Sequence, residues 1–148
     1  MEPRRNRRSK LMYQYKAKVV KVIDGDTIDV DIDLGFSVIL AKQRIRLYGI
    51  DTPESRTRNK EEKVRGLLSK EFVISKSPVG SYIRLVSHGK GKFGRILGEI
   101  YEIDNDLVSI NQQLCDESYA VPYFGQSKDD LAALHAANRD VLIEKGLI

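Results

Sequence analysis

The chain of 148 residues is 41% hydrophobic, carries a formal net charge of +4 and contains a single cysteine, Cys115. This length is typical of one globular domain with its own hydrophobic core. One cysteine excludes an internal disulfide and a cysteine-based zinc site, and we interpret Cys115 as a small buried apolar residue. No apolar run approaches the ~20 residues of a membrane span.

The charge is unevenly distributed. The first ten residues carry five basic side chains and one acidic side chain, whereas the other 138 residues carry 20 of each sign. We expect residues 1–12 to form a disordered basic arm and residues 13–148 to form the folded domain. The arm either holds nucleic acid through counterion release or only aids solubility. Because no apolar segment follows its charges, we expect no secretory signal, and therefore a cytoplasmic protein.

Three strands are predicted in the first third of the folded part. Residues 15–23 have the β-branched density of a strand. Residues 27–34 alternate between apolar and acidic side chains, which is typical of a half-buried strand. Residues 37–50 form a long third strand, in which Gly49 permits a bend. Pro53 ends this strand, and a polar loop follows.

Helices and two further strands fill the rest of the chain. Apolar spacing predicts a helix over residues 61–76. Two sequences that resemble capping boxes open a helix at Ser109, ending near Glu117, and another at Ser127, ending near Lys145. The predicted strands are residues 82–87 and 95–103. We therefore expect an α+β, mainly β fold: a five-stranded OB-like Greek-key barrel with three helices, and a monomer.

Carboxylates follow two of the predicted strands. Asp26 comes after an apolar run, within the segment Asp-Gly-Asp-Thr, and Asp51 comes after another. Each motif alone is typical of a turn or a strand end. Together they deliver two carboxylates to one end of the barrel. Hard cations such as Ca²⁺ bind carboxylates, backbone carbonyls and water, so Asp26, Asp51 and the Thr52 carbonyl are candidate ligands of one Ca²⁺ per chain.

Three further side chains complete a candidate catalytic site. Glu54 can polarise a water molecule for attack on phosphorus. Arg46 and Arg95 can each donate two hydrogen bonds to one phosphate. The combination predicts metal-assisted cleavage of a phosphodiester. Neither histidine is needed for this chemistry, and we interpret His88 and His135 as ordinary surface or helix residues.

With these motifs the chain resembles the thermonuclease family, the micrococcal-nuclease-like domains (staphylococcal nuclease homologues). The resemblance rests on four segments: VIDGDT (22–27), RLYGIDTPE (46–54), KFGR (92–95) and INQQLCDESYA (110–120). It implies an OB-like barrel with three helices and Ca²⁺-dependent cleavage of DNA and RNA. It also implies metal ligation by Asp26, Asp51 and Thr52, a general-base role for Glu54, and phosphate contacts from Arg46 and Arg95. Cleavage of the bond to the 5′ oxygen would leave 3′-phosphate ends.

The resemblance also implies contacts beyond the scissile phosphate, and these differ from the family pattern. Tyr123 matches a substrate-pocket tyrosine, and Lys92 and Phe93 lie in the substrate-binding segment. Phe93 stands where the well-known member has tyrosine, Gly91 where it has aspartate, and Gly125 where it has a second tyrosine. We expect an endonuclease of DNA and/or RNA with little sequence specificity. The alternative is a catalytically silent nucleic-acid- or protein-binding module of the same fold.

Overall fold

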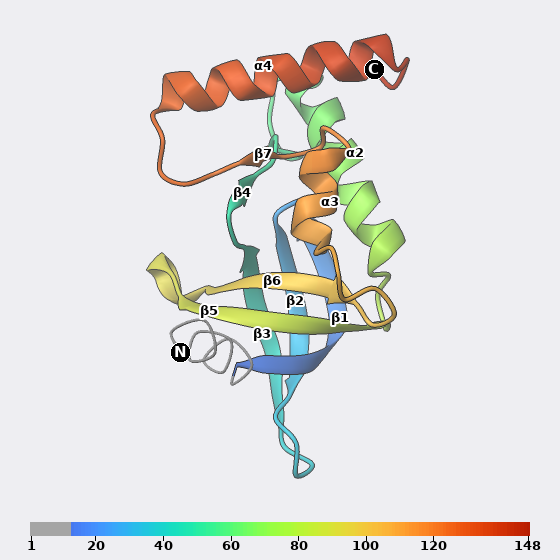
Figure 1. Cartoon of the computed structure of the whole chain (residues 1–148), viewed down its shortest axis with the longest axis vertical. Helices are drawn as coiled ribbons and strands as arrows, with labels where there is room; N and C mark the ends of the chain where they lie inside the picture. The colour runs from blue at the N-terminus through green and yellow to red at the C-terminus, as the bar shows by residue number, and fades with distance from the viewer. Residues whose placement is uncertain (1–12) are drawn as a thin grey trace.

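A closed five-stranded barrel forms the centre of the computed structural model, which describes residues 13–148 (Figure 1). The barrel order is β1-β2-β3-β6-β5, in which β3 and β6 run parallel and the other pairs run antiparallel. This confirms the predicted OB-like barrel. The arm expected at residues 1–12 lies outside the described residues. The barrel strands are β1 (Gln14–Asp24), β2 (Thr27–Asp33), β3 (Ile39–Leu47), β5 (Tyr82–Lys90) and β6 (Ile96–Glu102).

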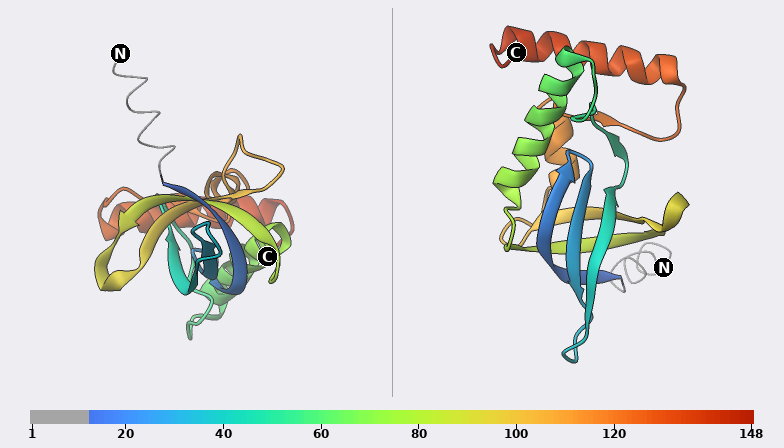
Figure 2. Two further views of the ribbon diagram at one scale, coloured as in Figure 1. Left: turned by 90° about the horizontal axis from the view of Figure 1, so that it is seen from below. Right: turned by 180° about the vertical axis from the view of Figure 1, so that it is seen from behind.

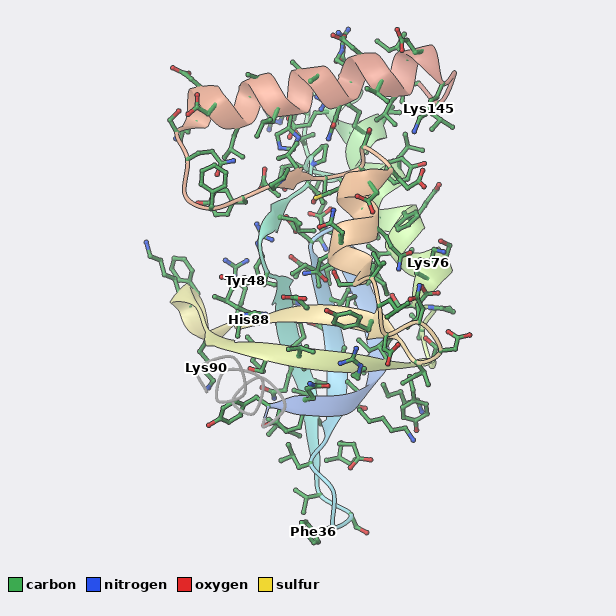
Figure 3. All side chains as sticks on the ribbon, in the orientation of Figure 1. Phe36, Tyr48, Lys76, His88, Lys90 and Lys145 are labelled. Carbon is green, nitrogen blue, oxygen red and sulfur yellow. The ribbon has the colours of Figure 1, made fainter. Side chains whose placement is uncertain are left out.

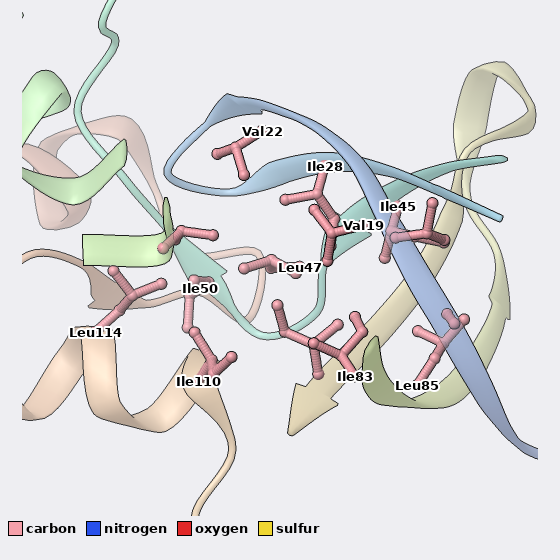
Figure 4. Packing of buried hydrophobic residues seen from close by; sticks show 14 of the residues in the cluster. Val19, Val22, Ile28, Ile45, Leu47, Ile50, Ile83, Leu85, Ile110 and Leu114 are labelled. Carbon is pink, nitrogen blue, oxygen red and sulfur yellow. The ribbon is translucent and has the colours of Figure 1, made fainter. Parts of the chain in front are cut away.

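The core fills the barrel and continues toward the helices. Side chains that alternate along β2, such as Ile28 and Val30, are fully buried, as the period of two predicted. They pack with Ile45 and Leu47 from β3. Figure 4 shows Ile28, Ile45 and Leu47 converging inside the barrel, with the helix that carries Ile110 at one end. Burial of this apolar surface is the main stabilising contribution to the fold.

Three α-helices lie between and after the strands within residues 13–148: α2 (Lys60–Lys76), α3 (Ile110–Asp116) and α4 (Lys128–Glu144). The predicted caps are confirmed, because Ser109 accepts a hydrogen bond from the Gln112 amide and Ser127 accepts one from the Asp130 amide. Figure 2 shows α2 running beside the barrel and α4 lying across its end. None of the helices in the described part is long and apolar enough to span a membrane.

The buried face of α2 consists of small residues. Gly66, Ser69 and Val73 are buried, whereas the apolar residues Val64 and Leu67 are 46% and 39% exposed. A Cβ at Gly66 would lie 2.4 Å from the Glu54 carbonyl oxygen. The helix therefore packs directly against the loop that carries Glu54, a contact that only a residue without a side chain allows.

The predicted strand over residues 37–50 is wrong in its extent. β3 ends at Leu47, and Gly49, with φ of 79°, turns the chain away from the barrel. The chain then forms β4 (Ile50–Asp51), which pairs with β7 (Val121–Pro122) in a separate two-stranded sheet. This small sheet, which lies between the barrel and α4 in Figure 1, carries Asp51 out toward α4.

Two connections extend from the barrel. β5 continues to Lys90, three residues beyond the predicted end of this strand at residue 87, and a 3₁₀ turn, η1 (Lys92–Gly94), follows it. The β2–β3 hairpin extends beyond the barrel, and its tip residue Phe36 is fully exposed at the end opposite α4 (Figure 3). Lys90, the last residue of β5 before loop 91–95, lies on another side of the molecule in Figure 3. The hairpin tip is therefore remote from the segment that carries Arg95.

Asn111 connects α3 to the barrel and to the turn before β4. Its side chain is 4% exposed and accepts a hydrogen bond from the Ile100 amide over 3.1 Å. Its amide nitrogen donates to the carbonyls of Tyr48, over 2.9 Å, and Gly98, over 3.1 Å. A buried side chain that satisfies three backbone groups fixes their relative positions, because leaving any of them unpaired is costly. Asn111 thus stabilises the departure of the chain from β3 toward Asp51.

Candidate functional site

Arg46 lies at the centre of the candidate site. On β3 it pairs with Thr27, next to Asp26 in the β1–β2 turn. Its Nη2 atom lies 3.5 Å from Asp26 Oδ2 and 3.6 Å from Asp51 Oδ1. One guanidinium therefore brings together the two carboxylates that the sequence placed at separate strand ends.

The backbone fixes the Arg46 side chain. Its Nη1 atom donates to the carbonyls of Leu47, over 2.9 Å, and Ile50, over 3.0 Å. The side chain is only 17% exposed. The turn at Gly49 produces this arrangement, because it folds the Ile50 carbonyl back toward the strand that it has just left. A guanidinium held on two sides loses little conformational freedom when it also binds a ligand.

The loop after β4 carries Thr52 and Glu54. Thr52 is 5% exposed, and Ser55, 4% exposed, donates a short hydrogen bond to Asp24 in the β1–β2 turn. The Glu54 amide donates to Glu62 Oε2 on α2 over 3.1 Å. The Asp-Gly-Asp-Thr segment alone is typical of a turn, whereas in the structure its first residue, Asp24, also anchors the loop after Asp51. The Asp-Gly-Asp spacing is the signal that could have identified it.

Negative charge is concentrated around Glu54. Partial burial raises the pKa of the Glu54 carboxyl, and the negative charges of Asp24, Asp26, Glu62 and Asp51 raise it further. The same group is therefore a stronger base than an ordinary glutamate. Within residues 13–148 no group of three or more His, Cys, Asp or Glu side chains is arranged to hold a metal ion by itself.

A groove of about 1050 Å³ opens beside Arg46 and Asp51. Lys92 and Arg95 line it from the segment between β5 and β6, and Tyr123 lines it from the segment after β7. Four cationic side chains, Arg46, Lys92, Arg95 and Lys128, thus line one cavity with a single lining carboxylate. This composition suits a phosphate chain.

Not every predicted residue lies in this groove. Thr52 and Glu54 line a smaller pocket of about 380 Å³, and Asp51 lines both cavities. Asp26 reaches the site through Arg46. Phe93 has φ of 66° and is 93% exposed on η1, outside the lining of the groove. The structure thus gathers Asp26, Arg46 and Asp51 tightly, places Glu54 beside Asp51 in the lining of the smaller pocket, and leaves Phe93 in solvent.

His135, interpreted from the sequence as an ordinary helix residue, belongs to the site. Its Nε2 atom lies 2.8 Å from Asp51 Oδ2, and its ring lines the smaller pocket. The residue spacing of α4 could have indicated this. One face of the helix is the less exposed one, and it carries Leu131, His135, Asn138 and Leu142. His88, in contrast, binds Glu99 on the outer surface of the barrel and stacks on Tyr48 with ring centroids 4.0 Å apart.

The fold and site define an OB-like barrel with carboxylates and arginines gathered at a groove, and comparison with known proteins identifies the family. The family described as "Staphylococcal nuclease homologue" matches residues 44–141. The chain belongs to this family. The match covers Arg46, Asp51, Glu54 and Arg95, while Asp26 lies before it.

Two curated relatives are similar to the chain over most of its length. An uncharacterized protein of Methanocaldococcus jannaschii is 31% identical over 129 residues, which cover 74% of this chain and 59% of the relative. A protein of Escherichia coli named "Uncharacterized endonuclease" is 35% identical over 97 residues, which cover 64% of this chain and 52% of the relative. The chain thus spans a little over half the length of these relatives.

Proposed function

We propose that the chain is a Ca²⁺-dependent nuclease that cleaves DNA and/or RNA with little sequence specificity and leaves 3′-phosphate ends. The observation that carries the proposal is the position of Arg46, between Asp26 and Asp51 and in one groove with Arg95. Family membership and the endonuclease name of one relative support a nuclease. Phosphate contacts carry no base information, which agrees with low sequence specificity.

The residues around Arg46 fit a hard cation. Asp26, Asp51 and the Thr52 carbonyl offer hard oxygen atoms of the kind that Ca²⁺ prefers. Partial burial and the carboxylates around Glu54 raise its pKa, and a cation bound beside these carboxylates would offset their charge. Because these ligands are few, backbone carbonyls, water and a substrate phosphate would complete the coordination. Bound there, Ca²⁺ would neutralise charge on the phosphate undergoing cleavage.

The side chains of the chain have separate roles in the proposed reaction. Glu54 orients a water molecule and accepts its proton as the oxygen attacks phosphorus. Arg46 and Arg95 donate hydrogen bonds to the phosphate oxygens on which charge develops, and this stabilises the transition state. The bond from phosphorus to the 5′ oxygen breaks, and the leaving oxygen takes a proton from water to become a 5′-hydroxyl. Lys92 and Tyr123 hold the neighbouring nucleotide in the groove, through a phosphate contact and through stacking.

A cleavage assay with identification of the product ends tests the proposal. Single- and double-stranded DNA and RNA are incubated with the protein and Ca²⁺, or with the protein and a calcium chelator, and the ends of the products are identified. We expect cleavage with Ca²⁺ only, and 3′-phosphate ends. Glu54→Gln should lose activity, whereas Glu71→Gln, a matched change at an exposed residue of α2, should retain it.

Each contrary result has a definite meaning. Cleavage that is unchanged by the chelator would overturn the metal requirement. Products with 5′-phosphate ends would overturn the assigned leaving group. Failure to cleave any of the four substrates while still binding them would favour the catalytically silent module.

A further inference from the structure

The Asp51 carboxylate is held from two sides by different elements. Its Oδ1 atom lies 3.6 Å from Arg46 Nη2, on the barrel. Its Oδ2 atom lies 2.8 Å from His135 Nε2, on α4. Since the two oxygens face different partners, rotation of the carboxylate about its Cβ–Cγ bond would break one contact or the other.

The helix that presents His135 is fastened to the rest of the fold. The Asn138 side chain donates to the Ala120 carbonyl over 2.9 Å, next to β7. Arg139 forms an ion pair with Glu61 at the start of α2. Leu142 is 1% exposed. These contacts lie within two turns of His135, so the ring approaches Asp51 from a fixed position, as a group that orients another must do.

The other ring nitrogen indicates how the contact is protonated. His135 Nδ1 is buried and has no hydrogen-bond partner among the residues that the structure describes. A proton on Nδ1 would be buried without an acceptor, which is costly. The neutral tautomer with its proton on Nε2 avoids this cost and donates directly to Asp51 Oδ2. This contact fixes the orientation of the Asp51 carboxylate.

We propose that His135 is a positioning residue for Asp51, holding Oδ2 so that Oδ1 stays turned toward Arg46 and Asp26. The inference rests on the proposed function, because it assigns Asp51 to a calcium site. Partners that orient metal-binding side chains commonly change metal affinity roughly 10- to 100-fold when they are removed. His135 should therefore govern Ca²⁺ affinity much more strongly than it governs the rate at saturating Ca²⁺.

Calorimetric titration of the full chain with Ca²⁺ alone, at about pH 8, tests the inference directly. His135→Leu removes the donor at similar volume, and we expect its Ca²⁺ dissociation constant to rise roughly 10- to 100-fold. His135→Gln offers an N–H near the position of Nε2 and should restore affinity to within about threefold. His88→Leu is the matched control at the other histidine, which binds Glu99, and should retain wild-type affinity.

A second measurement separates affinity from chemistry. The Ca²⁺ concentration for half-maximal cleavage should rise in His135→Leu by the same factor as the dissociation constant, while the rate at saturating Ca²⁺ falls much less. Wild-type affinity in a folded His135→Leu would overturn the positioning role. A loss of thermal stability with unchanged affinity would make the contact a tether of α4 only, and would also overturn it.

Two remaining outcomes are also decisive. If His135→Leu does not fold, His135→Gln is compared with His135→Asn, whose shorter amide cannot reach Oδ2. Equal affinities of these two variants would overturn the inference, and weaker binding by His135→Asn alone would support it. If the wild-type chain binds no Ca²⁺ and cleaves nothing, the proposed function itself fails. That result is distinct from one in which the wild-type chain and His135→Leu bind Ca²⁺ and cleave nucleic acid equally well. The latter result overturns only the positioning role of His135.

Discussion

Arg46 acts on both the shape and the charge of the site. Its guanidinium supports the turn to β4 through two backbone carbonyls and faces Asp26 and Asp51 with its other nitrogen. Arg95 lines the same groove from the segment before β6. Both arginines thus place positive charge at the groove, and the two backbone contacts of Arg46 give it a structural role as well.

We predict that Arg46→Ala and Arg95→Ala each lower the turnover number at least ~100-fold, as expected when a donor to a developing oxyanion is removed. Cleavage under single-turnover conditions at saturating Ca²⁺ measures this. Arg46→Ala should also lower the denaturant midpoint, because it leaves the Leu47 and Ile50 carbonyls without their donor. Arg44→Ala, which breaks an exposed pair with Asp29 on the same strand, is the control and should cleave normally. A near wild-type rate in Arg46→Ala or in Arg95→Ala would show that the replaced arginine is not part of the catalytic site.

The second prediction concerns the protonation of Glu54. Partial burial and four neighbouring carboxylates raise its pKa, so the folded protein keeps this proton at pH values where the unfolded chain has lost it. Stability from this group therefore falls as pH rises through the interval between the ordinary glutamate value and the raised one. We expect carbon-detected NMR of the calcium-free protein to show Glu54 titrating above the ordinary glutamate range.

The variant Glu62→Gln tests the cause of this shift. Glu62 lies close enough to accept a hydrogen bond from the Glu54 amide, and its charge is one of those that raise the Glu54 pKa. Its neutralisation should lower the Glu54 pKa. Glu117→Gln, at the exposed end of α3, should not change it. A Glu54 pKa that is unaltered in Glu62→Gln would assign the shift to burial and the aspartates alone.

At the scale of elements, α2 sets the position of the Glu54 loop. A Cβ at Gly66 would lie 2.4 Å from the Glu54 carbonyl oxygen and 2.6 Å from the Ser55 nitrogen. Both are backbone atoms, so the contact cannot be relieved by a side-chain rotation. Glycine costs roughly 1 kcal/mol relative to alanine in a helix interior, and here the close approach outweighs that cost.

We therefore predict that Gly66→Ala destabilises the protein by about 1–3 kcal/mol, although alanine is the better helix former. Urea unfolding measures the change, and the amide shifts of Glu54 and Ser55 report displacement of the loop. Cleavage should also slow, because Glu54 moves relative to Asp51. Lys63→Ala, exposed on the same helix, is the control and should change stability little. A more stable Gly66→Ala with unmoved amide shifts would contradict the packing.

The elements also show how far the sequence could predict the site. Period-two burial and the strand-end carboxylates were enough to predict the barrel and the meeting of Asp26 with Asp51. The β4–β7 pair could not be predicted, because two residues per strand carry no periodic signal. The contact of His135 with Asp51 depends on how α4 docks over that pair. Its helical stripe predicts an inward face but not which carboxylate the face meets.

At the scale of the whole molecule, charge is separated along the chain. Residues 1–10 carry the entire net positive charge, and the remaining 138 residues are formally neutral. The groove nevertheless presents Arg46, Lys92 and Arg95 to a ligand. Local placement within the fold therefore provides the phosphate contacts at the site, and any contribution of the N-terminal residues to affinity would be a separate, longer-range electrostatic one.

The last prediction isolates that contribution. Arg4, Arg5, Arg7 and Arg8 are replaced together by glutamine in the Glu54→Gln background, which prevents cleavage while binding to single-stranded DNA is measured over a range of salt concentrations. Each phosphate contact adds about 0.7 to the slope of log affinity against log salt, so four lost contacts would flatten it by about 3. The matched control, Lys18→Gln with Lys21→Gln, changes exposed residues of β1 outside the groove and should leave the slope nearly unchanged. An unaltered slope in the arginine variant would mean that residues 1–10 do not touch the nucleic acid, and that the groove alone accounts for binding.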